Sequence, residues 1–290
     1  MKKFFMASLG MALLLAAGCT KDGGASVGPS VVEVNGEARN FKTGHLEEVL
    51  TDETITSLVW KGGKIDAADI AAIRSHCRTT LEVLDINKLR FAPGDEQFET
   101  LLDGSGKYGK ITESNKVPDK IFSDFKALRE VKLPPLQSVG AWAFRNCDKI
   151  ETIDIPRGVI EIEKYAFISG RNLKKLILPE GLTTMGLQAF SGSSYASTPY
   201  QLEEIELPST LLGMRDDTFL PYPVAGNLKT VTCKAKTPPR VEQGSTLNTL
   251  GNVFGPVKDG LKIYVPGSSV EAYKSAPRWS GHADCIFPLE

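Results

Sequence analysis

A short pattern recurs along the middle of the chain. The unit L-x-x-L-x-L-P, with Ile accepted for Leu, occurs four times and begins at Leu128, Ile150, Leu173 and Leu202. Successive units are 22, 23 and 29 residues apart. Such self-similarity predicts stacked coils, because one coil alone cannot bury its apolar side chains whereas neighbouring coils share a continuous core. The chain is therefore predicted to be an elongated solenoid.

Apolar and polar residues alternate within each unit, as in Leu128-Arg-Glu-Val131-Lys-Leu133. Alternation with a period of two indicates a short strand with one buried face. The proline that follows has no N–H to donate, so it ends the strand and turns the chain. Weaker copies of the strand pattern extend the array in both directions; they begin at Ile55, Leu81, Leu228 and Leu261.

A second pattern follows each strand and ends in Ala-Phe, at Ala143-Phe144, Ala166-Phe167 and Ala189-Phe190. We expect this half to return the chain as a short helical or irregular turn with its Phe in the core. Periods of about 20 to 29 residues are typical of leucine-rich repeats. The predicted fold is a leucine-rich-repeat solenoid, a right-handed α/β-type coil in which short parallel strands alternate with short helical or irregular returns.

The repeat resembles the BspA-like leucine-rich repeats of Bacteroidetes envelope proteins. That family combines L-x-x-I-x-I-P with A-F-x-x-C-x-x-L, which Ala143-Phe144-Arg-Asn-Cys147-Asp-Lys-Ile150 matches closely. The stretch from Leu46 to Ile86 is similar to its N-terminal region. Val265 to Lys274, with Trp279 and Ile286, is similar to its C-terminal cap. The resemblance implies a surface lipoprotein that binds host or neighbouring-cell components.

The N-terminus predicts export and lipid attachment. Lys2 and Lys3 precede an apolar run of 14 residues that ends at Ala17. A membrane-spanning helix needs about 20 residues, so this run indicates a cleaved signal. Leu15-Ala16-Ala17-Gly18-Cys19 resembles a bacterial lipobox, in which the cysteine becomes the acylated first residue. We expect Cys19 to anchor the protein in the outer membrane, facing the cell surface or the periplasm; the alternative is an ordinary secretory signal with an incidental cysteine.

These patterns divide the chain into five parts. They are a lipoprotein signal peptide (1–18), a flexible tether rich in small polar residues (19–30), an N-terminal cap with degenerate repeats (31–127), the leucine-rich repeats (128–227), and the final repeats with a C-terminal cap (228–290). Removal of the signal takes away two lysines and no acidic residue, so the formal net charge changes from −1 to −3. A nearly neutral chain gives no electrostatic reason to expect nucleic acid as a partner.

Four cysteines remain after Cys19, and none of them forms a CxxC pair. Cys147 and Cys233 occupy repeat positions that we expect to be buried, so free core thiols are the preferred interpretation. A disulfide between Cys233 and Cys285 is the alternative, because an exported protein meets an oxidising compartment.

We find no pattern that predicts catalysis, a metal site or a cofactor. The segment Gly104 to Lys110 fits G-x-x-x-x-G-K, but Ile111 stands where a P-loop needs Ser or Thr for its metal. A glycine-rich surface turn explains it better. The three histidines, His45, His76 and His282, lack a partner at metal-binding spacing.

Binding surfaces are more promising than catalytic sites. The outward strand positions are polar and mixed in sign, without the aromatic platform on which sugar rings stack, so glycan binding on this face is disfavoured. Two insertions, 191–201 and 220–227, contain Tyr195, Tyr200 and Tyr222. Insertions in repeats form loops, and tyrosine is enriched at interfaces, so these three are the candidate partner-binding residues. Alternatively, the tyrosines only cover adjacent coils.

The sequence thus predicts a monomeric envelope lipoprotein, not an enzyme, that recognises a protein or cell-surface partner in adhesion or a related interaction. The alternative function is carbohydrate capture for a nutrient uptake system, which an exposed aromatic cluster would support. The residues do not identify the ligand.

Overall fold

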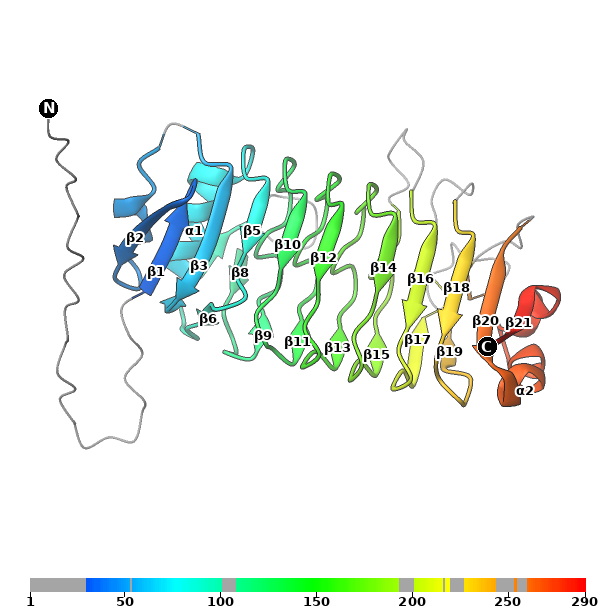
Figure 1. Cartoon of the computed structure of the whole chain (residues 1–290). Helices are drawn as coiled ribbons and strands as arrows, with labels where there is room; N and C mark the ends of the chain where they lie inside the picture. The colour runs from blue at the N-terminus through cyan, green and yellow to red at the C-terminus, as the bar shows by residue number, and fades with distance from the viewer. Residues whose placement is uncertain are drawn as a thin grey trace, which may run out of the picture.

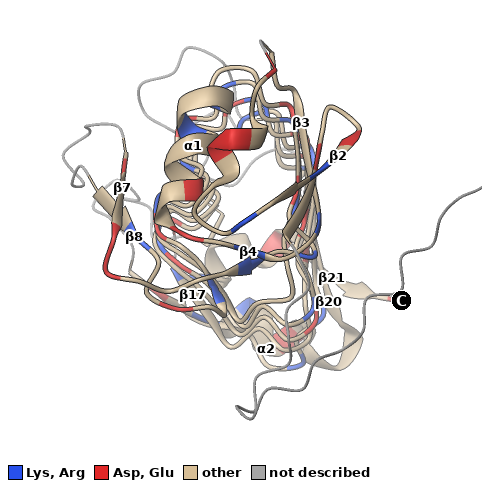
Figure 2. Cartoon of the chain, turned by 90° about the vertical axis from the view of Figure 1, so that its left-hand side faces the viewer, with Lys and Arg blue, Asp and Glu red and all other residues tan. Residues whose placement is uncertain are grey.

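The computed structural model describes residues 30–52, 54–100, 108–192, 201–215, 217–219, 227–243, 253–254 and 260–290. The described part is an elongated stack of coils that runs from a small N-terminal sheet to a helical C-terminal end (Figure 1). Viewed along the stack, successive coils lie behind one another (Figure 2). This arrangement confirms the predicted repeat solenoid.

One side of the stack, which we call the front face, is formed by the strands of the L-x-x-L-x-L units. Where neighbouring front strands pair, they are parallel and in register, so that Val131 lies beside both Leu84 and Ile153. In these strands the residues on either side of the central inward residue, such as Glu130 and Lys132 beside Val131, point outward, which confirms the predicted outward positions. The front strands are β3 (Ser57–Gly62), β5 (Val83–Asp85), β10 (Glu130–Lys132), β12 (Thr152–Asp154), β14 (Lys175–Ile177), β16 (Glu204–Leu207), β18 (Thr230–Cys233) and β20 (Lys262–Pro266).

The return half of each coil contains a strand that the sequence did not predict. These short strands pair in parallel into a second sheet, which we call the back sheet. The chain then enters the turn that carries Ala-Phe. The return is therefore more regular than predicted. The back strands are β9 (Lys116–Val117), β11 (Ser138–Val139), β13 (Glu161–Ile162), β15 (Thr184–Met185), β17 (Gly213–Arg215) and β19 (Arg240–Glu242).

Aromatic rings form a continuous stack inside the coils. The ring centroids of Phe144, Phe167 and Phe190 are 5.1 Å apart at each step, and the rings are nearly parallel. Phe122 extends the stack at one end and Phe219 at the other, at 5.4 and 5.8 Å. All five side chains are buried, which confirms that the Phe of each return points into the core.

The N-terminal end of the solenoid is covered by antiparallel strands and a helix. Strands β1 (Ser30–Val34) and β2 (Glu37–Phe41) form a hairpin that pairs with β3. Helix α1 (Ala67–Cys77) begins at a capping box: the Asp66 carboxylate accepts from the N–H groups of Ala68 and Asp69, and Asp69 accepts from the Asp66 N–H. The remaining short elements are η1 (Leu46–Val49), β4 (Lys64–Ile65), β6 (Arg90–Phe91), β7 (Gln97–Glu99) and β8 (Tyr108–Lys110).

A buried guanidinium joins α1 to the first coil. Arg74 donates hydrogen bonds to the carbonyl oxygens of Glu99, Ile121 and Ser123, at 2.8, 3.0 and 3.2 Å. These donors satisfy carbonyl oxygens that would otherwise need hydrogen-bond donors from a preceding coil. Helix α1 therefore closes the stack at this end.

The C-terminal end is closed by η2 (Gly267–Ser269), α2 (Val270–Ser275), η3 (Ser280–Cys285) and β21 (Ile286–Leu289). The buried rings of Tyr273 and Trp279 meet edge to face, with centroids 4.9 Å apart. The Tyr273 hydroxyl donates to the Ala235 carbonyl at 2.8 Å, and Trp279 Nε1 donates to the Pro239 carbonyl at 3.0 Å. No helix in the described part of the chain has the length and apolar character to cross a membrane.

Candidate binding surface

The charged side chains of the front face are mostly paired with one another. Lys175 Nζ lies 2.8 Å from the carboxylate of Glu204, and Lys132 Nζ lies 3.0 Å from that of Glu130. Acidic and basic residues are interspersed around the described coils (Figure 2). Exposed pairs of this kind contribute at most about 1 kcal/mol each. Further pairs join neighbouring coils: Arg129–Glu151, Lys229–Glu203 and Lys234–Glu206.

The hydrogen-bonded ladder of the front strands is interrupted between two neighbouring coils. Strand β12 is the last strand of one hydrogen-bonded sheet, and β14 is the first strand of the next. On the back sheet the same two coils remain paired through β13 and β15. Their returns also stay bonded, since Phe167 N donates to the Ala189 carbonyl at 2.8 Å, one coil further along. The solenoid is therefore continuous at the back and open at the front.

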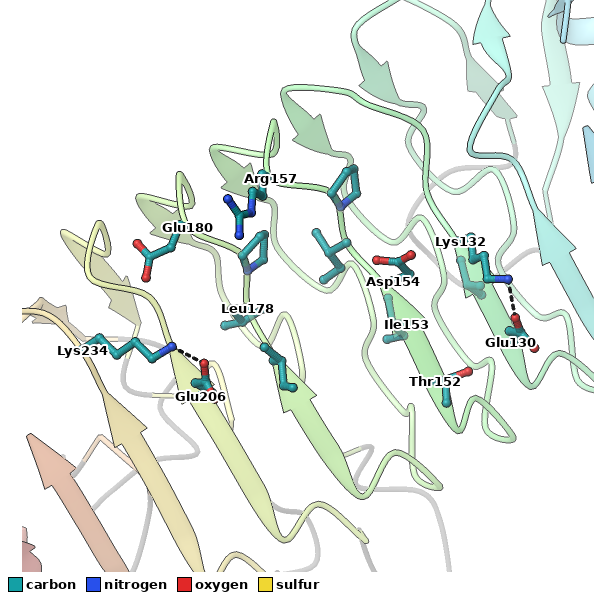
Figure 3. Close-up of a pocket in the computed structure, with 15 residues that line it drawn as sticks. Glu130, Lys132, Thr152, Ile153, Asp154, Arg157, Leu178, Glu180, Glu206 and Lys234 are labelled. Carbon is teal, nitrogen blue, oxygen red and sulfur yellow. Dashed lines mark hydrogen bonds and ion pairs between the residues drawn. The ribbon is translucent and has the colours of Figure 1, made fainter. Parts of the chain in front are cut away.

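A groove of about 700 Å³ lies at this interruption. It runs along the ends of β10, β12 and β14 and the turns that follow them (Figure 3). Its volume is in the range typical of ligand sites, about 300 to 1,000 Å³. Its lining is Glu130, Val131, Lys132, Thr152, Ile153, Asp154, Ile155, Pro156, Arg157, Ile177, Leu178, Pro179, Glu180, Glu206 and Lys234.

Apolar side chains are accessible in the groove. Ile177 points outward from β14 and is 53% exposed. Ile153 occupies the inward position of β12 but is only half-buried, whereas the equivalent Val131 and Leu176 are fully buried. The interruption therefore gives solvent partial access to a side chain that the other coils keep in their core.

Charged groups beside the groove are free to meet a ligand. Asp154 and Arg157 are exposed and form no ion pair with any described residue (Figure 3). Glu180 accepts hydrogen bonds from the backbone N–H and the hydroxyl of Ser209, at 3.1 and 2.8 Å. The Ser209 backbone bond holds the pKa of Glu180 below its usual value, so this carboxylate stays ionised at neutral pH. The groove thus combines apolar surface with unpaired charges of both signs.

The residues that the sequence predicted as functional lie outside the described part of the chain. They are the lipidation site Cys19 and the candidate partner-binding residues Tyr195, Tyr200 and Tyr222. The groove was not predicted. Its one visible signal is Ile177, an apolar residue at an outward strand position.

The P-loop-like segment does not have the structure of a P-loop where it is described. Gly109 and Lys110 lie in β8, which pairs with β7 in an antiparallel hairpin. Lys110 Nζ forms an ion pair with Asp95 at 2.9 Å. A P-loop would instead place its lysine at the start of a helix. The described residues also contain no group of three His, Cys, Asp or Glu side chains placed to hold a metal ion.

The four cysteines that the structure describes are free thiols. Cys77, Cys147 and Cys233 are buried, and Cys285 is partly exposed. Burial raises the pKa of Cys77 and of Cys147 to about 12. Cys233 Sγ lies 3.1 Å from the Tyr273 hydroxyl. The buried core thiols are confirmed, and the alternative Cys233–Cys285 disulfide is not formed.

One aromatic pair lies near the surface on the return side of the coils. Trp142 and Tyr165 stack with centroids 5.2 Å apart, and both are only half-buried. The ammonium groups of Lys120 and Lys164 lie 5.6 and 5.1 Å from the centre of the Trp142 ring. Since sugar stacking needs an open ring face, this mutually stacked and lysine-flanked pair is a poor platform for a glycan.

A sequence model of the BspA type leucine rich repeat region matches residues 109–221, in six copies. The matched residues include β10 to β17 and both walls of the groove. No curated protein matches the chain.

Three solved structures are similar to parts of the chain. The T. pallidum leucine rich repeat protein TpLRR is 21% identical, with a TM-score of 0.37 and coverage of 61% of this chain and 63% of that one. The pneumococcal vaccine antigen PcpA is 20% identical, with a TM-score of 0.38 and coverage of 62% and 38%. A leucine-rich repeat protein from Bacteroides ovatus is 19% identical, with a TM-score of 0.36 and coverage of 57% and 51%. The chain spans less than two thirds of the length of each.

Proposed function

Because residues 109–221 match the model of BspA type leucine rich repeats, we propose that this chain is a binding protein that recognises a protein partner through the front face of its solenoid. Repeat solenoids offer extended surfaces on a rigid frame and serve widely in binding. The observation that carries this proposal is the groove between β12 and β14. At the groove the front face presents accessible isoleucines and charged side chains without ion-pair partners, whereas its other charged side chains are mostly paired.

The groove suits a protein partner better than a small charged ligand. Ile153 and Ile177 offer apolar contacts, and Asp154 and Arg157 offer charges of opposite sign from one strand and its following turn. Burial of one exposed isoleucine side chain contributes about 1.5 to 3 kcal/mol, whereas rim charges mainly set orientation and association rate. The apolar contact therefore supplies the affinity.

Lipid attachment through Cys19 forms part of the proposal. Acyl chains partition into a bilayer with about 0.8 kcal/mol per buried methylene, so two or more chains on one residue hold a protein firmly. A polar tether at 19–30 would let the solenoid stand away from the membrane, where a partner can reach the front face. Protease treatment of whole cells tests this: loss of the solenoid from intact cells places it on the outer surface, and complete protection places it in the periplasm.

A pair of matched variants tests the binding surface. The protein is screened against an array of purified host and neighbouring-cell proteins, and the dissociation constant of each hit is measured for Ile177→Lys and Leu212→Lys. Leu212 is 67% exposed and lies beside the back sheet, so its substitution is the control for a surface charge. We expect Ile177→Lys to weaken binding about 10- to 100-fold, from the loss of about 1.5 to 3 kcal/mol.

Two results would redirect the proposal. If a partner binds both variants equally but loses affinity with Tyr195→Ala plus Tyr222→Ala, the loops carry recognition and the groove does not. If the protein binds glycans on an array and no protein, the carbohydrate-capture alternative replaces the proposal.

A further inference from the structure

The interruption between β12 and β14 leaves backbone groups without partners. In β12, Thr152 N donates to the Arg129 carbonyl, and the Asp154 carbonyl accepts from Leu133 N at 3.0 Å, so these two residues face β10. Successive residues of a strand direct their N–H and C=O groups to opposite sides. The N–H and C=O of Ile153 therefore point toward β14.

The edge of β14 that faces β12 also has backbone groups without partners. Leu178 N donates to the Glu206 carbonyl at 3.0 Å, and the Lys174 carbonyl accepts from Glu203 N at 2.8 Å, so these groups face β16. The groups of Lys175 and Ile177 consequently point toward β12. Neither residue has a backbone partner on that side among the residues that the structure describes.

Equivalent steps elsewhere in the solenoid show what is missing. At five other steps the backbone N–H of the residue before a front strand donates to a carbonyl oxygen of the preceding coil, at 2.8 to 2.9 Å. These bonds run from Glu82 to Thr56, from Arg129 to Glu82, from Glu151 to Arg129, from Glu203 to Lys174 and from Lys229 to Glu203. The corresponding bond from Lys174 to Glu151 is absent, as is a bond between Ile155 and Ile177. Two strand edges with unpaired backbone donors and acceptors thus face each other across the groove.

From these unpaired edges we infer that an extended peptide segment of the partner binds in the groove as an additional strand between β12 and β14. The inference rests on the proposed function and specifies its ligand. A peptide backbone offers N–H and C=O groups to both sides, so one strand satisfies both edges. Strand side chains alternate, so every second residue would point inward, toward Ile153, and should be apolar.

The charges beside the groove set a further requirement on the peptide. Asp154 and Arg157 lie near one end of the groove and lack ion-pair partners within the described chain. An outward peptide residue near each would pair with it if it carried the opposite charge. The ligand class is therefore an extended segment with alternating apolar residues and flanking charges of both signs.

Hydrogen exchange of the full-length protein tests the free edges first. The amides of Ile153, Ile155, Lys175 and Ile177 should exchange at least tenfold faster than those of Val131 and Leu176, which are bonded in the ladder. Equal protection of both sets would show a closed ladder in solution and would overturn the inference.

A library of synthetic heptapeptides then tests the occupant. Peptides selected on the protein should slow exchange at the four edge amides, and N-methylation of alternate peptide amides should weaken binding at least tenfold with side chains unchanged. Ile177→Lys should abolish selection, and Leu212→Lys should not. If no selected peptide protects these amides, or if N-methylation has no effect on those that do, the inference is wrong.

Binding at the front face and addition of a strand can fail separately. A protein partner that loses affinity with Ile177→Lys but leaves the four edge amides unprotected supports the front-face binding function and refutes the added strand. A partner insensitive to Ile177→Lys refutes both.

Discussion

Replacement of a ring in the middle of the Phe stack gives the sharpest test of how the solenoid is held together. Phe167 is buried and has a parallel ring 5.1 Å away on each side, contributed by Phe144 and Phe190. Truncation of a buried Phe to Ala costs about 3 to 5 kcal/mol, from lost transfer free energy and the cavity left behind. We expect Phe167→Ala to lower the free energy of unfolding by this amount.

A more conservative variant isolates the contribution of ring stacking. Phe167→Leu keeps most of the apolar volume but removes two aromatic pairs, each worth about 0.5 to 1.5 kcal/mol. It should therefore cost about 1 to 3 kcal/mol. The control is Phe287→Ala, because Phe287 is 40% exposed and lies at the C-terminal edge; we expect it to cost about 1 kcal/mol.

The measurement is urea-induced unfolding followed by circular dichroism and by tryptophan fluorescence. Both probes are needed because repeat proteins do not always unfold in a single step. A cost for Phe167→Ala no larger than that for Phe287→Ala would refute the shared aromatic core. A neutral Phe167→Leu would show that apolar volume alone, without stacking, stabilises the coils.

Three further predictions concern single side chains. Ser169 has a positive φ of 73° and a buried hydroxyl without a hydrogen-bond partner. Ser169→Gly should therefore raise the free energy of unfolding, measured by urea titration, by about 1 kcal/mol, and a lower free energy of unfolding would contradict this prediction. Burial lowers the pKa of His282 to about 4 from 6.5; the unfolded chain therefore binds a proton that the folded chain excludes between these pH values. Stability should be complete above pH 6.5 and fall by up to about 3 kcal/mol as the pH drops to 4, a loss that His282→Gln should reduce. Of the four described cysteines, Cys285 alone is partly exposed, so alkylation of the native protein followed by peptide mass mapping should modify it first; equal labelling of the buried thiols would contradict the packing.

The front strands could be predicted because each has a clear period-two pattern. Leu128, Val131 and Leu133 are all buried, and Glu130 and Lys132 between them face outward. The back strands carry a single inward residue each, such as Val139 in β11. One apolar residue cannot produce an alternating pattern, so the sequence indicated a buried residue there but did not predict a strand.

The groove could not be predicted for a different reason. Ile153 fits the strand pattern as well as Val131 does, and Leu176 follows the same rule in the next coil. Whether two neighbouring strands pair depends on the spacing between coils, which the whole coil determines and no single residue encodes. Only the exposed Ile177 departs from the polar outward pattern at this step, and a single apolar surface residue is common in proteins.

We expect a partner to bind at the groove in the front face. Hydroxyl-radical footprinting of the protein, alone and saturated with a partner found on the array, tests this claim most directly. We expect strong protection of Ile153, Pro156 and Ile177, with Leu212 and Phe287 unchanged. Protection confined to the back sheet or to the return turns, with Ile177 as reactive as in the free protein, would contradict it.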